Sequence, residues 1–190
     1  SVTLSITCTD NTDGTGCANM QITNNGVFDT ETWEAFIANK EWQLTTGDNS
    51  KTVSIRYQDS AGNISATYKN NITLDTTKPV ISAVSDTPDP FKPSVKEEKK
   101  IVEFTLADNL SGMCMTIVRV STQTGIVVRN ITKNTPCPST GTVNFIIWDG
   151  KNSTGNIVPA GTYIYDVISV DNAMNSKVLG TPYLIIHLTF

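Results

Sequence analysis

The sequence predicts an all-β protein made of two β-sandwich domains in tandem. Only 17% of its residues are charged and 38% hydrophobic, and Thr, Ser and Asn fill the difference, a composition typical of β-rich chains. Short segments with alternating apolar residues are bounded by turn residues. The pattern Asp-x-Ala-x-Asn occurs twice, at Asp59–Asn63 and Asp171–Asn175, each time where such a segment ends. The length of 190 residues accommodates two domains of about 100 residues.

The first half contains a series of predicted strands. They cover Val2–Thr7, Met20–Thr23, Thr52–Tyr57 and Thr67–Leu74. The segment Glu31–Lys40 has two interpretations, a helix or a short segment crossing between strands. Pro79 cannot donate to a strand ladder and ends the series. We therefore expect domains at residues 1–78 and 79–190.

Motifs of the first half follow one another in a fixed order. They are Val2-Thr3-Leu4, Asp10, Met20, Trp33, Trp42-Gln43-Leu44, Gly47-Asp48, Lys51-Thr52-Val53, Asp59 to Asn63, and Leu74 to Pro79. In this order they resemble the Ig-like modules of bacterial and archaeal surface proteins. The resemblance implies an Ig-like or fibronectin-III-like β-sandwich.

In that family another strand precedes the Val-Thr-Leu motif, whereas here the motif begins at Val2. The resemblance therefore implies a first domain without its first strand. Either chain upstream of Ser1 supplies it, or a neighbouring subunit donates it in a head-to-tail assembly. The apolar segment Pro182–Phe190 is a candidate donor, and it is also the expected last strand of the second domain.

The second half predicts a strand at Ile101–Leu106, a hairpin of Cys114–Val120 with Gly125–Val128, and a strand at Val143–Trp148. A denser block of motifs follows: Trp148-Asp149-Gly150, Gly155, Gly161-Thr162-Tyr163, and Asp171 to Asn175. This block resembles the Ig-like domain of the flagellar hook-capping protein type, a C-terminal module of secreted bacterial proteins. Two departures are Met174, where the family has Gly, and Pro88–Ser94, which lacks the family's acidic Gly-Asp-Gly tail.

Two of the four cysteines lie in each half of the sequence. Of three possible connectivities, Cys8–Cys17 with Cys114–Cys137 keeps each bond within one domain. Disulfides predict an oxidising compartment, outside the cell or at its surface. The alternative is four buried thiols in a cytosolic protein.

The repeated Asp-x-Ala-x-Asn pattern has a structural interpretation. An Asp side chain can bond the backbone two residues on and begin a turn, and Gly or Asn closes it in a left-handed conformation. The functional alternative is calcium, which prefers carboxylate oxygens. Its candidate ligands are Asp10, Asp13, Asp59 and Asp75, gathered at one end of the first domain. No other cofactor is expected.

No catalytic motif is found, and we expect no enzyme activity. The single histidine, His187, lies in an apolar strand and is expected to be a packed or edge residue. Asp149 and Asp166 are a formal carboxylate pair for glycoside cleavage, but Asp149 belongs to the Trp-Asp-Gly turn. A net charge of −4 argues against nucleic-acid binding, which needs clustered Lys and Arg. The one basic cluster, "KEEKK" at Lys96–Lys100, contains two glutamates and is expected to be a solvated loop. No apolar run approaches the ~20 residues of a membrane helix.

These observations predict a structural or adhesive segment, a stalk or spacer, of an extracellular or cell-surface protein. Its expected partners are other modules of the same polypeptide or neighbouring surface subunits. The alternative is an accessory module of a secreted enzyme that binds carbohydrate or assists sorting. Trp33 and Trp42 are the candidates for sugar stacking, although sandwiches also need large aromatic residues such as Trp148 in their cores.

Overall fold

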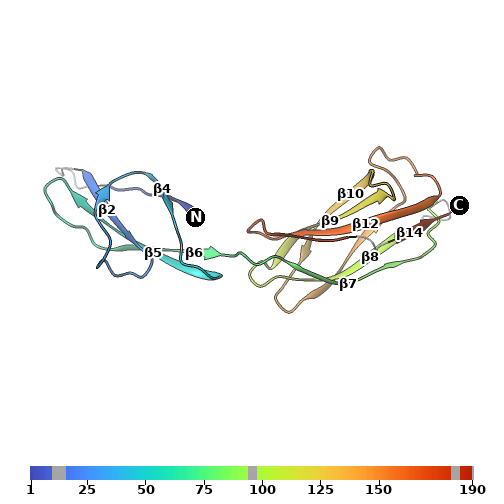
Figure 1. The fold of residues 1–190 in the computed structure, drawn as a ribbon, viewed down its shortest axis with the longest axis horizontal. Helices are drawn as coiled ribbons and strands as arrows, with labels where there is room; N and C mark the ends of the chain where they lie inside the picture. The colour runs from blue at the N-terminus through green and yellow to red at the C-terminus, as the bar shows by residue number, and fades with distance from the viewer. Residues whose placement is uncertain (10–15, 94–97, 181–184, 190) are drawn as a thin grey trace. The chain divides into compact units, whose positions relative to one another are not determined.

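The computed structural model describes residues 1–9, 16–93, 98–180 and 185–189, and every regular element in these ranges is a β-strand (Figure 1). The all-β prediction is thus confirmed. Two compact units, Ser1–Asp75 and Thr76–Phe190, divide the chain, where we expected the division after residue 78. Within the described ranges, no helix has the length and apolar character needed to cross a membrane.

The first unit consists of two small antiparallel sheets. One pairs β1 (Val2–Ser5) with β4 (Asn39–Trp42). The other has the order β3 (Glu34–Ala35), β2 (Cys17–Thr23), β5 (Asn49–Asp59), β6 (Tyr68–Leu74). The helix interpretation of Glu31–Lys40 is wrong, because the segment contains β3 and the start of β4, and β3 pairs with β2.

The core of the first unit is small and partly open. Its buried members are Ile6, Met20, Ile22, Leu44 and Val53. A larger group of apolar side chains packs against them but stays half-exposed: Val2, Leu4, Phe36, Trp42, Ile55, Tyr57, Ile72 and Leu74. Much of the apolar surface of this unit therefore remains in contact with water.

The second unit has two sheets of its own. One has the order β11 (Thr142–Trp148), β8 (Lys100–Ala107), β7 (Val80–Thr87). The other has the order β10 (Val127–Pro136), β9 (Met113–Thr122), β12 (Gly161–Val170), β13 (Ser176–Leu179). A further strand, β14 (Ile185–Leu188), pairs with β12 at Gly161–Ile164 (Figure 1).

Alternation along these strands builds a closed core. On β8 the inward residues are Val102, Phe104 and Leu106, and on β12 they are Tyr163, Tyr165 and Val167, all buried. Trp148 is 1% exposed, as predicted, and its ring lies 5.7 Å from that of Tyr163 and 5.8 Å from that of Phe91. The second unit therefore has the better-packed core of the two.

The C-terminal strand belongs to this core. Ile186 and Leu188 are buried. The amide of Phe91 donates to the His187 carbonyl at 2.8 Å, and the amide of Thr189 donates to the Phe91 carbonyl at 3.0 Å. For the residues described, the interpretation of the C-terminal segment as the last strand of its own domain is confirmed.

Candidate functional site

Asp59 at the end of β5 forms the first of the two repeated turns. Its Oδ1 accepts hydrogen bonds from the amides of Ala61 (2.9 Å) and Asn63 (2.8 Å), and its Oδ2 accepts one from Asn63 Nδ2 (2.8 Å). These bonds, above all the one from the Asn63 side chain, hold the pKa of Asp59 below its ordinary value. Gly62 has a φ of 91°, which favours glycine. This geometry is the turn that was predicted for Asp59 and Asn63.

Asp171 at the end of β12 forms the second turn, and its carboxylate accepts the same two bonds from an asparagine four residues on. Its Oδ1 accepts from the Asn175 amide at 2.8 Å, and its Oδ2 from Asn175 Nδ2 at 2.9 Å. Met174 takes the left-handed position with a φ of 69°, and its side chain is 78% exposed. The two turns differ in burial, because Asp171 is only 4% exposed whereas Asp59 is half-buried.

The register of β5 and β6 separates two of the proposed calcium ligands. Leu74, which precedes Asp75, lies opposite Asn49 at one end of β5, and Asp59 ends the same 11-residue strand at the other. At ~3.3 Å per residue, Asp59 and Asp75 are about 30 Å apart. The prediction that these two residues gather at one end is wrong. Because β5 and β6 are antiparallel, the C-terminal ends of the two strands lie at opposite ends of the pair. Asp10 and Asp13 lie outside the described residues.

The Trp-Asp-Gly motif is also a structural turn. Trp148 Nε1 donates to the Lys151 carbonyl at 2.9 Å, and the Lys151 amide donates to Asp149 Oδ1 at 3.1 Å. Gly150 has a φ of 74°, and a Cβ there would lie 2.6 Å from the Cβ of Pro93. The remaining predicted residues serve the same block: Gly161 begins β12, and the Tyr163 hydroxyl donates to the Pro159 carbonyl at 2.8 Å.

The groups considered for catalysis each have a structural partner. Asp149 Oδ1 is engaged in its turn. Asp166 Oδ2 accepts from Arg119 Nε at 2.9 Å, across the β9–β12 pair. His187 lies between β12 and the Phe91 segment, and its exposed side chain has Nδ1 3.0 Å from Asp89 Oδ2. None of these contacts assembles a nucleophile, a base and a substrate cavity.

Lys100 is a site residue that sequence reasoning missed. The loop at Lys96–Lys100 was expected to be solvated, yet Lys100 is completely buried. Its ammonium group pairs with Asp86, lies 3.6 Å from Asp89 Oδ1 and donates to the Pro88 carbonyl at 2.6 Å. Burial, together with the negative charge of Asp86, raises the pKa of the Tyr165 hydroxyl, which donates to Asp86 Oδ2. The alternation along β8 could have indicated this burial, because Lys100 lies two residues before Val102 and therefore on the same inward face.

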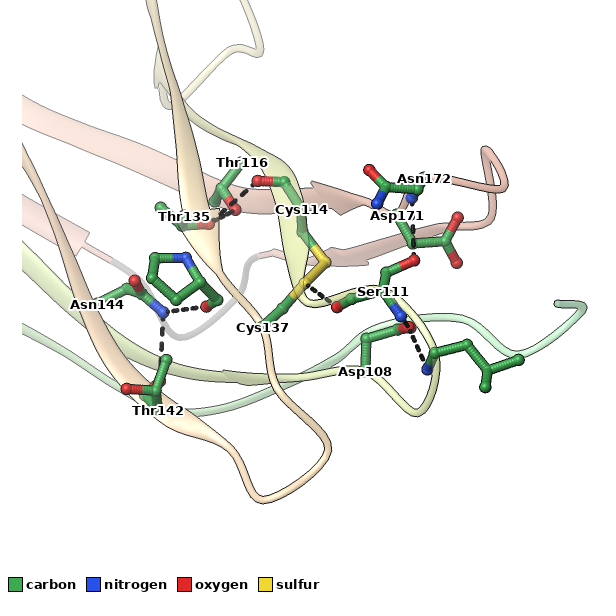
Figure 2. Close-up of a disulfide and its surroundings, with 12 residues drawn as sticks. Asp108, Ser111, Cys114, Thr116, Thr135, Cys137, Thr142, Asn144, Asp171 and Asn172 are labelled. Carbon is green, nitrogen blue, oxygen red and sulfur yellow. Dashed lines mark hydrogen bonds between the residues drawn. A yellow bond between two sulfur atoms is a disulfide. The ribbon is translucent and has the colours of Figure 1, made fainter. Parts of the chain in front are cut away.

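Both disulfides join the cysteines that were expected to pair. Cys8 is bonded to Cys17 in the first unit and Cys114 to Cys137 in the second. The second bond lies within a network that includes the amide of Asp108, which donates to the Cys137 carbonyl at 2.9 Å, and the amide of Cys137, which donates to the Gly112 carbonyl at 3.0 Å. Figure 2 shows this bond with Asp108, Ser111 and Asp171 beside it.

The first unit contains an open groove of about 970 Å³. One wall is the segment Thr3–Thr9, which includes most of β1, and the other is β6 with Tyr68, Lys69, Asn70 and Ile72. Side chains of β5 also line the groove: Val53, Ile55 and Tyr57. Each wall is an edge strand, because β1 pairs only with β4 and β6 only with β5 among the described strands. The groove therefore has mixed polar and apolar walls, with apolar side chains of β5 among them, and it is bounded by two open strand edges.

Some amides of β1 point away from β4, the one strand with which β1 pairs among those described. The Ile6 amide donates to the Ala38 carbonyl at 2.7 Å, on the β4 side. Amides alternate in direction along a strand, so that of Leu4 points toward β4 as well, whereas those of Thr3 and Ser5 point to the opposite edge. The groove thus presents backbone donors to anything that lies in it.

The two tryptophans of the first unit are half-buried. Trp42 packs against the core and its Nε1 donates to Asn24 Oδ1 at 2.8 Å. The guanidinium carbon of Arg56 lies 5.3 Å from the Trp33 ring centroid and 4.4 Å from that of Phe28. Arg56 thus occupies a ring face of Trp33 that stacking on a sugar would use.

Comparisons with known proteins find similarity of fold. No family model and no curated protein matches the sequence. The fibronectin(III)-like modules of CbhA from Clostridium thermocellum match at a TM-score of 0.53 and 12% identity, over 99% of this chain and 85% of that one. Dimeric latent PorU from Porphyromonas gingivalis matches at a TM-score of 0.43 and 17% identity, over 95% of this chain and 17% of that one. The CbhA match confirms the predicted fold class, whereas the hook-capping type of the second domain stays a prediction.

Proposed function

We propose that residues 1–190 form a non-catalytic structural segment, a spacer with an adhesive first unit, of an extracellular or cell-surface protein. The observation that carries the proposal is the modular build of the chain. Each unit folds around its own core and contains its own disulfide. Only residues 75–79 lie between β6 and β7, and they end in Pro79. A connection this short with a proline suits a series of modules that keeps its parts apart.

The extracellular location is supported by chemistry. Disulfides persist in oxidising compartments and are rare in the cytosol, where thiols are kept reduced. The chain contains four cysteines, and all four are joined in two disulfides. Fibronectin-III-like modules are compatible with this location but do not decide it.

The adhesive part of the proposal depends on the groove between β1 and β6. Its occupant would be an extended segment of another polypeptide, with apolar side chains at alternate positions facing Val53 and Ile55. Main-chain groups of that segment would pair with the amides of Thr3 and Ser5. The lining contains one acidic and one basic side chain, Asp59 and Lys69, so an uncharged strand is the better fit.

The test is a replacement experiment in the full-length gene product. Residues 1–190 are exchanged for two unrelated β-sandwich domains of similar length. A spacer role predicts that surface display of the remaining protein is preserved, and the adhesive role predicts that attachment to its partner is lost. Loss of an enzyme activity located elsewhere in the chain, with binding of soluble residues 1–190 to a glycan array, would instead support the accessory-module alternative.

A further inference from the structure

Two buried aspartates meet at one end of the second unit. Asp108 follows β8 and Asp171 follows β12, strands that belong to the two different sheets of this sandwich. Each residue is only 4% exposed. Each offers a carboxylate oxygen within 4.8 Å of the other's. Residues far apart in the sequence thus bring two acidic groups together in a largely water-excluded place (Figure 2).

One oxygen of this pair has no hydrogen-bond donor. Asp108 Oδ1 accepts from the amides of Leu110 (3.1 Å) and Ser111 (2.7 Å). Asp108 Oδ2, by contrast, is buried without a partner. Among the residues that the structure describes, no Lys, Arg or His side chain forms an ion pair with Asp108 or Asp171. Among the described residues, the pair therefore has no compensating positive charge.

Such an arrangement is unfavourable unless a cation joins it. A buried carboxylate needs a partner, and two like charges at this distance repel each other strongly away from water. A bound divalent cation reverses both effects, because each carboxylate then becomes a ligand. Both donors are oxygens, without sulfur or imidazole, and this set favours calcium over zinc or copper.

The surrounding loop is held in place before any ion arrives. The Asp108 amide donates to the carbonyl of Cys137, which the disulfide joins to Cys114. The Asn172 amide donates to Ser111 Oγ at 3.1 Å, so the Asp108 loop and the Asp171 turn are tied together. The disulfide and the turn thus fix both carboxylates, which lowers the cost of ordering a site.

We propose that the second unit binds a calcium ion through Asp108 Oδ2 and the carboxylate of Asp171. Water and main-chain carbonyl oxygens would complete the six to eight oxygen ligands that calcium takes. The site differs from the one predicted from the sequence, which drew its ligands from the first domain. Asp59, in the matching turn of the first unit, is half-buried, and its carboxylate accepts three hydrogen bonds from Ala61 and Asn63 of the same turn.

The experiment uses the full 190-residue chain, freed of metal with EGTA and dialysed. With the dissociation constant of about 10⁻⁴–10⁻³ M that extracellular modules show, about 10 mM CaCl2 raises the Tm of the second unit by roughly 5–15 °C. The same concentration of MgCl2 gives a much smaller shift, because magnesium dehydrates reluctantly. Equal shifts with the two salts, or none with calcium, would overturn the proposal.

Two matched variants locate the effect. Asp108→Asn removes the charge and keeps an oxygen for the Leu110 and Ser111 amides, so the metal-free variant is at least as stable as the natural chain but no longer responds to calcium. Asp59→Asn, in the other turn, retains the full response. A calcium shift that persists in Asp108→Asn contradicts the assignment. Should that variant fail to fold, calcium titration of the natural chain by NMR decides: the amides of Leu110, Ser111 and Asn172 shift if the site is correct, and remain unmoved if it is not.

Discussion

Lys100 and Asp86 form an ion pair inside the second unit, between the strands β8 and β7. The Lys100 side chain is completely buried, and Asp86 also accepts a hydrogen bond of 2.9 Å from the Tyr165 hydroxyl. A strand of one sheet thereby supplies a cation, its neighbour a carboxylate, and the facing sheet a phenol. A buried pair of this kind is costly to break, because the partner left behind keeps its charge without compensation.

We expect Lys100→Met to destabilise the second unit by about 3–5 kcal/mol. The methionine fills most of the same space but leaves the largely buried Asp86 without its cation and with only the hydrogen bond from Tyr165. The double variant Lys100→Met with Asp86→Asn should recover a large part of the loss, because neither charge then remains. Urea denaturation measures both, with Lys99→Met, an exposed neighbour, as a control expected to change stability by no more than about 0.5 kcal/mol. Equal stability of Lys100→Met and Lys99→Met would contradict the buried pair.

The disulfide Cys114–Cys137 is expected to stabilise the second unit by about 3 kcal/mol. The bond closes a loop with a sequence separation of 23, and cross-linking a loop of this size lowers the entropy of the unfolded chain. Replacing both cysteines by alanine should therefore lower the Tm of that unit and leave that of the first unlowered. Mass spectrometry of the natural chain without reductant should find no free thiol, and four titratable thiols in the folded protein would contradict the extracellular assignment.

Proline substitutions should map the open edge of β1. The amide of Ser5 faces away from β4, so Ser5→Pro removes no hydrogen bond within the first unit and is expected to cost less than about 1 kcal/mol. Leu4→Pro removes a bond to β4 and places a ring in the ladder, which costs about 3 kcal/mol or more. Thermal unfolding of the two variants gives the comparison.

The same proline also tests strand binding. If the groove accepts a strand from another polypeptide, Ser5→Pro abolishes that binding in a folded protein, and Ser5→Ala does not. Binding that survives Ser5→Pro would show that the occupant does not pair with β1.

Replacing Met174 by glycine should stabilise the second unit. Met174 has a φ of 69°, a conformation that costs about 1–2 kcal/mol for a residue with a Cβ, and its exposed side chain contributes little packing. Glycine also raises the conformational entropy of the unfolded chain, which offsets part of this stabilisation. The expected net increase in the free energy of unfolding is roughly 0.5–1 kcal/mol. Gly62→Ala in the first unit, at a φ of 91°, is the reciprocal change and should destabilise. A loss of stability in Met174→Gly would contradict the assigned turn.

The turn at Asp59 should make the first unit sensitive to acid. Its hydrogen bonds lower the pKa of Asp59 in the folded state, so the folded protein binds this proton less readily than the unfolded chain. The stabilisation is present above the ordinary Asp pKa of about 3.9 and is lost as pH falls through the lowered value. We therefore expect Asp59→Asn to reduce the Tm of the first unit at about pH 6, and this difference to vanish at about pH 2. A difference that stays constant with pH would contradict the ionised turn.

Patterns confined to one strand or one turn were predictable. The strand Val143–Trp148, the burial of Trp148 and the two Asp-x-Ala-x-Asn turns follow from alternation and turn chemistry, which are local properties. Strands β7 and β13 carry no clear alternation, with several exposed residues in each, and were not predicted. The segment Glu31–Lys40 was ambiguous because its aromatic spacing satisfies both helix and strand.

Relationships between distant residues were not predictable. The burial of Lys100 depends on Asp86 and Tyr165, which reach it only through the pairing of β8 with β7 and the packing of the two sheets. The meeting of Asp108 with Asp171 depends likewise on two sheets ending at the same level. Composition showed many acidic residues but not which two would share a buried space. Register, which places Asp59 and Asp75 at opposite ends of one strand pair, is set by backbone pairing and has no signature in the residue types.

The position of β14 in the sequence sets the order in which the two units can fold during synthesis. All described strands of the first unit lie within the first 74 residues, so that unit can fold while the rest is still being made. The second unit has to wait, because Ile186 and Leu188, which cover its core beside Phe91, follow all its other described strands in the sequence. Until they leave the ribosome, apolar surface around β12 stays uncovered. A chain that stopped before β14 would thus carry one finished module and one open, aggregation-prone sheet.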